Sequence, residues 1–338
     1  MKKFGIAAIA AAAIAATSFA APAQACDIKR PIVFGNLDWD SNAFHTEVAR
    51  LILEKGYGCK TDTIPGSTIP LNAGIVRGDV DVLMEIWSNT APQVWTDGVK
   101  AGKVEALGIN YPDAVQAWYV PKYLVEGPNA PAPDLKSVSD LVKYKELFKD
   151  PEEPTKGRFY NCILGWSCEV INTKKLHAYG LDKDFSNFRP GTGAALSAVI
   201  ESSVKRHKPI VFYYWGPTWV LGKIGDDVVQ LKEPAYDDAA WKQMMDAKSP
   251  ADVTKATAYP LTKVYVGVNT EFAKLAPDAI AFLKNYRTTA ALASKALAYM
   301  QDHDGSAKDA AVNFLKTRQD LWTKWVPADV AKKVEAAL

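Results

Sequence analysis

The chain has 338 residues, with 40 Lys and Arg against 38 Asp and Glu, and 10 Trp. This length exceeds one small core and suits about two domains. The 48% hydrophobic and 23% charged residues exclude a disordered chain, and a formal charge of +2 gives no electrostatic reason to bind nucleic acid.

Residues 1–25 have the pattern of a secretory signal peptide. Two lysines form a basic start, an Ala- and Ile-rich run follows, and Ala23-Gln24-Ala25 supplies small residues before a cut. A membrane anchor is the alternative, but the apolar run is short for a span and Pro22 closes it. Cleavage after Ala25 predicts a periplasmic protein with 38 basic and 38 acidic residues, so that the leader accounts for the whole net charge.

The next part of the chain alternates predicted strands with predicted helices. The strands are expected over residues 31–37, 60–64 and 80–86, and the helices over residues 43–55 and 68–77. This alternation predicts a parallel sheet with helices on both faces.

A second unit is predicted to begin near residues 117–121. The elements expected after it are helices over 137–144, 170–179 and 193–205, strands over 209–214 and 263–268, and helices over 276–285, 290–301, 307–317 and 330–338. We expect the chain to return to the first unit near the strand over 263–268. The predicted fold class is therefore α/β, with lobe 1 over residues 26–118 and 264–338, lobe 2 over residues 119–263, and two crossings at a hinge.

Four cysteines in an exported chain favour two disulfides, for which three connectivities are possible. Cys162 and Cys168 are close enough in sequence to close a small loop, and Cys26 would then pair with Cys59. A lipid anchor on Cys26 is disfavoured, because Gln24 stands where a lipoprotein has a small or aliphatic residue. No Cys or His cluster has metal-ligand spacing, so we expect no metal and no cofactor.

Four tryptophans stand in polar segments near the ends of predicted elements: Trp39, Trp87, Trp166 and Trp215. Each indole face can attract a cation by about 0.5–2 kcal/mol. A quaternary ammonium group has no N–H to donate, so several aromatic faces arranged as a cage recognise it best. The alternative is that these side chains only pack. A carboxylate on the ligand would suit the N–H groups of the helix that follows Gly165-Trp166-Ser167-Cys168.

These segments resemble the periplasmic glycine betaine-binding proteins of ABC transporters, which serve quaternary amine uptake. The resemblance rests on Glu85-Ile86-Trp87 and on the segments 162–169 and 209–219. It implies a two-lobed periplasmic binding protein of type II, a Cys162–Cys168 disulfide and an ABC permease at the inner membrane as partner. The residues that it implies are the cage Trp87, Trp166 and Trp215 and the carboxylate-binding N–H groups around Ser167 and Cys168. We expect the receptor to be a monomer.

Two departures from the enteric pattern bear on the ligand. Ala91 stands where some members have a His, and Trp39 adds a fourth wall with acidic neighbours, Asp38 and Asp40. We expect Trp39, Asp38 and Glu85 to contact the ligand as well. Glycine betaine is the first expectation; the nearby carboxylates favour a more cationic or smaller amine, and the alternatives are choline, carnitine, proline betaine and trimethylamine N-oxide.

Two other classes of protein compete with a receptor. A periplasmic enzyme acting on a methylated amine would need an acid, base or nucleophile at the cleft, and the candidates are Asp38, Asp40, Glu85 and Glu169. No Ser, His and Asp arrangement with a nucleophile elbow is present, so we expect no catalytic residue and no enzyme. An adhesive protein with outward-facing tryptophans is the other alternative.

Overall fold

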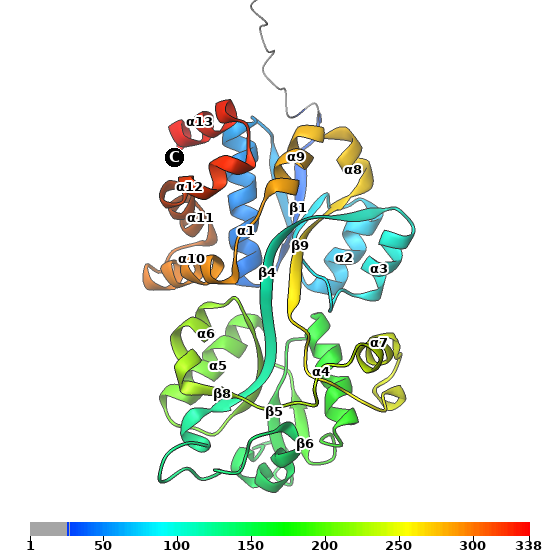
Figure 1. Ribbon diagram of the computed structural model, residues 1–338, viewed down its shortest axis with the longest axis vertical. Coiled ribbons are helices and arrows are strands. Elements are labelled where there is room, and N and C mark those ends of the chain that lie inside the picture. Colours follow the sequence, from blue (N-terminus) through cyan, green and yellow to red (C-terminus); the bar gives the residue numbers. More distant parts are fainter. Residues whose placement is uncertain (1–25, 27) are drawn as a thin grey trace, which may run out of the picture.

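The computed structural model describes Cys26 and residues 28–338, so the predicted signal peptide lies outside the described residues. Figure 1 shows two lobes joined by two long strands, β4 and β9. The described strands form one mixed sheet in the order β2-β1-β3-β9-β4-β7-β5-β6, with β8 beside β4. Their bounds are β1 Ile32–Leu37, β2 Thr61–Gly66, β3 Val82–Trp87, β4 Val104–Pro121, β5 Gly157–Tyr160, β6 Phe185–Phe188, β7 Val211–Gly216, β8 Val228–Gln230 and β9 Thr262–Asn269.

Helices cover both faces of the sheet in the first lobe. They are α1 Asp40–Leu51, which continues as a π-helical turn over Ile52–Gly56, α2 Thr68–Arg77, α3 Gln93–Lys100, α8 Thr270–Leu275, α9 Pro277–Asn285, α10 Ala290–Asp302, α11 Ala307–Thr317, α12 Gln319–Trp322 and α13 Ala328–Ala337. Alternate residues of β3 serve two separate cores. Val82 and Met84 pack under α1 and the C-terminal helices, while Leu83 packs with α2 and α3.

The second lobe has its own core around β5, β6 and β7, which pair in parallel. Its helices are α4 Ser167–Ala178, α5 Gly193–Lys205, α6 Trp219–Ile224 and α7 Asp238–Asp246, with a longer 3₁₀ segment over Val138–Phe148. Two sequence predictions were wrong here by a few residues. Helix α4 begins at Ser167 instead of 170, because Trp166 is its N-cap residue, and β7 extends to Gly216, so Trp215 lies within the strand.

The prediction of a parallel sheet holds for β1, β2 and β3 but is wrong for the two long strands. Strand β9 runs antiparallel to β3 and to β4, and β4 runs antiparallel to β7. One strand leaves the first lobe and the other returns to it, so they must run in opposite directions. Strand β4 changes its partner from β9 to β7 between Ala114 and Val115. We propose that the lobes divide within β4 and β9, where the predicted boundaries also fall.

Both expected disulfides are present. Cys26 bonds to Cys59 and ties the start of the described chain to the segment after α1, while Cys162 bonds to Cys168 and closes the loop before α4. Within the described part of the chain, no helix has the length and apolar character needed to cross a membrane.

Candidate functional site

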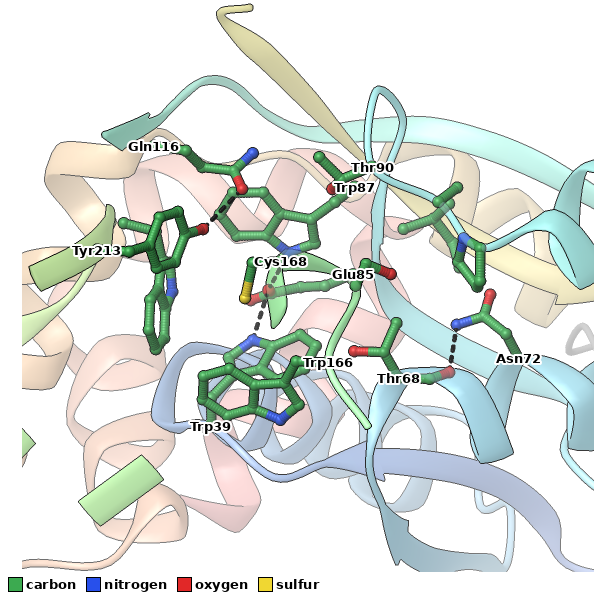
Figure 2. Close-up of a pocket in the computed structure, with 15 residues that line it drawn as sticks. Trp39, Thr68, Asn72, Glu85, Trp87, Thr90, Gln116, Trp166, Cys168 and Tyr213 are labelled. Carbon is green, nitrogen blue, oxygen red and sulfur yellow. Dashed lines mark hydrogen bonds between the residues drawn. The ribbon is translucent and has the colours of Figure 1, made fainter. Parts of the chain in front are cut away.

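Four tryptophans meet between the lobes, two from each. Trp39 is the N-cap residue of α1 and Trp87 is the last residue of β3, both in the first lobe. Trp166 caps α4 and Trp215 lies in β7, both in the second lobe. All four line one cavity of about 50 Å³. Figure 2 shows Trp39 and Trp166 along one side of this cavity and Trp87 on the opposite side.

The indole rings are arranged edge to face. The ring centroids of Trp39 and Trp166 lie 5.6 Å apart with planes at 81°, and those of Trp166 and Trp215 lie 5.0 Å apart at 89°. Such pairs hold each other in place while leaving their π faces at different orientations. Trp166 is therefore the contact between the two halves of the cage, and only 3% of its surface is exposed.

Seven of the eight predicted ligand residues line this cavity: Trp39, Glu85, Trp87, Trp166, Ser167, Cys168 and Trp215. The cavity also contains residues that the sequence did not single out: Thr68, Asn72, Thr90, Gln116 and Tyr213. Tyr213 had a usable signal, because it stands two residues before Trp215 in a strand and must share its face. The four polar residues come from elements whose approach to the cavity depends on the fold.

Glu85 lies behind two walls of the cage. Its Oε2 atom accepts hydrogen bonds from the indole Nε1 of Trp39 at 2.8 Å and of Trp87 at 3.0 Å (Figure 2). The side chain is buried, and this burial raises the pKa of Glu85, while hydrogen bonds from the two indoles, Ser41 and Tyr111 act against the rise. One carboxylate thus fixes the orientation of two aromatic faces.

Asp38 does not line the cage, which corrects the sequence prediction. Its Oδ1 atom instead accepts a hydrogen bond of 2.6 Å from the indole Nε1 of Trp166, across the gap between the lobes. Asp38 lines a second cavity of about 270 Å³ on the other side of Trp39 and Trp166, together with Asp40. Burial raises the pKa of both carboxyls. Asp38 therefore positions a wall and links the lobes.

We expect Asp38→Ala to weaken binding of tetramethylammonium, the simplest probe of an aromatic cage, by about three- to tenfold, because Trp166 loses a charge-assisted hydrogen bond. Isothermal titration calorimetry measures the change. Asp38→Asn is the matched control, since its carbonyl oxygen can still accept from Trp166, and it should lose less affinity. Equal losses in the two variants would contradict the positioning role.

The loop before α4 brings backbone donors to the cavity. Gly165 has φ +92°, a conformation that glycine adopts readily, and its carbonyl accepts from the backbone N–H of Ile69 in the first lobe at 3.2 Å. The Cys162–Cys168 disulfide closes this loop. Ser167 and Cys168 form the first turn of α4, whose N–H groups and positive dipole end suit a ligand carboxylate.

The described residues offer neither a metal site nor a catalytic histidine at the cage. No group of three His, Cys, Asp or Glu side chains among them has a metal-binding arrangement. His45 is fully buried, which lowers its pKa to about 3, and its Nδ1 pairs with the hydroxyl of Tyr286 at 2.8 Å. The arrangement of four indole faces can hold a cation.

A family model described as the substrate binding domain of the ABC-type glycine betaine transport system matches residues 30–317. The glycine betaine/proline betaine-binding periplasmic protein of Escherichia coli K12 is 26% identical over 213 residues, which are 60% of this chain and 62% of that protein. The trimethylamine N-oxide-binding protein of Pelagibacter ubique is 23% identical over 327 residues, which are 96% of this chain and 99% of that protein. The alignment thus spans less than two thirds of the E. coli relative.

Two solved structures share the fold. A glycine betaine/L-proline-binding protein from Borrelia burgdorferi has a TM-score of 0.72 at 20% identity, covering 90% of this chain and all of that one. An ABC-transporter choline-binding protein in complex with choline has a TM-score of 0.71 at 18% identity, covering 91% and 97%. These likenesses confirm the predicted two-lobed α/β fold class.

Proposed function

Because the chain belongs to the family of substrate-binding domains of ABC-type glycine betaine transport systems, we propose that it is the receptor of an ABC importer for a trimethylated ammonium compound. This is a family of binding proteins and not of enzymes. The observation that carries the proposal is the convergence of four indole rings, two from each lobe, on one cavity. Cation–π attraction from several aromatic faces is sufficient for useful affinity toward a small ligand.

The division of the cage between the two lobes couples ligand binding to closure of the lobes. Trp39 and Trp87 belong to one lobe and Trp166 and Trp215 to the other, so the cage is complete only when the lobes meet. A cation that contacts all four faces stabilises the closed form relative to the open one. The closed form would then dock on the permease at the inner membrane, with the receptor acting as a monomer in the periplasm after cleavage following Ala25.

Within this class, glycine betaine is the candidate that the family favours, with its carboxylate on the N–H groups of Ser167 and Cys168. Choline, carnitine, proline betaine and trimethylamine N-oxide are the alternatives. Relatives of this chain are named for glycine betaine with proline betaine and for trimethylamine N-oxide.

Calorimetry and intrinsic tryptophan fluorescence with these five compounds test the proposal. We expect at least one to bind with a 1:1 stoichiometry, to change the tryptophan emission and to raise the melting temperature, because a ligand that binds only the folded state stabilises it. The compound should be recovered unchanged after incubation. If none of the five changes the emission or the melting temperature, the proposal fails.

A further inference from the structure

Glu85 is a buried acid without a counter-ion in the described chain. Its exposed fraction is 2%, and no Lys, Arg or His side chain among the described residues lies within salt-bridge distance of it. The groups around this carboxylate are all neutral: the indole N–H groups of Trp39 and Trp87 donate to Oε2, and the hydroxyls of Ser41 and Tyr111 lie beside it. A buried charge that lacks an opposite charge is costly, so this carboxylate favours a cation nearby.

The surroundings of the cage add negative charge and no positive charge. Neither cavity has a Lys, Arg or His among its described lining residues. Asp38 and Asp40 stand beside the Trp39–Trp166 wall, and neither forms an ion pair with another described residue. The nearby Glu201 and Glu169 are already paired, with Lys205 and Arg189 respectively. The unpaired charge around the cage is therefore negative.

From this charge balance we propose that the Glu85 carboxylate is the counter-ion of the ligand, and that the site selects trimethylammonium compounds with a net positive charge over zwitterions. The inference rests on the proposed function and changes the order of its candidates: choline, a cation, precedes glycine betaine, a zwitterion. The carboxylate of a zwitterion would be repelled by the same acid that attracts its ammonium group.

The attraction between the Glu85 carboxylate and the ammonium group of the ligand is large enough to decide between cationic and zwitterionic ligands. Two opposite unit charges separated by roughly 5–8 Å at an effective dielectric constant of about 20 attract each other enough to change a binding constant by tens to hundreds of fold. The first turn of α4 can offset part of the repulsion of a ligand carboxylate, but a helix end carries only about half a unit charge. The full charge of Glu85 should therefore outweigh it.

The test uses the full mature chain and the variant Glu85→Gln, with calorimetry on three ligands of similar size. Choline carries the positive charge, 3,3-dimethyl-1-butanol is its neutral carbon isostere, and glycine betaine is the zwitterion. The glutamine carbonyl can still accept both indole N–H groups, so the cage keeps its acceptor and loses only the charge. Glu201→Gln is the matched control, because Lys205 already neutralises that acid.

In the unmodified chain we expect choline to bind at least tenfold more tightly than glycine betaine. In Glu85→Gln, choline should lose at least tenfold, while 3,3-dimethyl-1-butanol changes less than threefold and glycine betaine does not weaken. Glu201→Gln should stay within twofold for all three.

Several results would overturn the counter-ion assignment while leaving the proposed function intact. One is tighter binding of glycine betaine or trimethylamine N-oxide than of choline by the unmodified chain, which needs no variant. Another is an equal loss for all three ligands in Glu85→Gln, which would mean that the acid only holds the indoles. If no methylated amine binds the unmodified chain, the proposed function itself fails.

Discussion

Replacing Trp166 by alanine should weaken binding of the ligand by tenfold or more. Trp166 supplies one of the four faces, and its ring also sets the positions of Trp39 and Trp215 through edge-to-face contacts of 5.6 and 5.0 Å. One cation–π wall is worth about 0.5–2 kcal/mol, and loss of the two ring contacts adds to this. Titration calorimetry with the tightest of the five amines measures the change.

Two further variants separate the causes. Trp166→Phe keeps an aromatic face but cannot donate to Asp38, whereas Trp166→Leu keeps apolar bulk without the π face. We expect the leucine variant to lose more affinity than the phenylalanine variant. Trp325→Phe, in the core of the first lobe, is the control for general effects of removing an indole and should leave affinity unchanged. An unaltered affinity in Trp166→Ala would remove this residue from the cage.

Replacing Lys175 by methionine should destabilise the protein by about 3–5 kcal/mol, because it leaves the Glu233 carboxylate buried and unpaired. Lys175 on α4 is fully buried, and its Nζ lies 2.5 Å from Oε1 of Glu233 and 3.9 Å from the ring centroid of Tyr259. Burial lowers the pKa of Lys175, while Glu233 acts against that change. Urea denaturation monitored by circular dichroism measures the stability.

The double variant Lys175→Met with Glu233→Gln should regain much of the lost stability, because it removes both buried charges. Lys205→Met is the control, because it breaks the ion pair between Glu201 and a lysine that is largely exposed. It should lower the free energy of unfolding by less than about 1 kcal/mol. If Lys175→Met and the double variant were equally unstable, the loss would come from packing around Tyr259 and not from the unpaired charge.

The aromatic part of the site follows from local patterns. Trp39 and Trp87 stand at the carboxyl ends of two parallel strands, and Trp166 stands at a helix start, so their convergence is predictable from element boundaries. The disulfide between Cys162 and Cys168 is also predictable from local sequence, because the two cysteines are only six residues apart.

The contacts of the two acidic residues, Glu85 and Asp38, cannot be predicted from local patterns in the sequence. The sequence predicted that Glu85 and Asp38 contact the ligand. Glu85 lines the cavity and its ligand contact stays a prediction, Asp38 lies outside the cavity, and both carboxylates accept indole N–H groups, which the sequence did not predict. Trp39 and Glu85 are 46 residues apart, and Trp166 and Asp38 are 128 apart. No periodicity along the chain encodes which donor meets which acceptor over such separations.

From the sequence, short-range periodicity and spacing therefore determined the α/β alternation and favoured the close Cys162–Cys168 pair. The resemblance to a known family implied the tryptophans of the cage, and the leader and the ligand contacts stay predictions. Only the tertiary structure decided the antiparallel course of β4 and β9, the contribution of Gln116 and Tyr213, and the pairing of carboxylates with indoles. Those features arise where the two lobes meet, and that contact exists only after the chain has crossed between them twice.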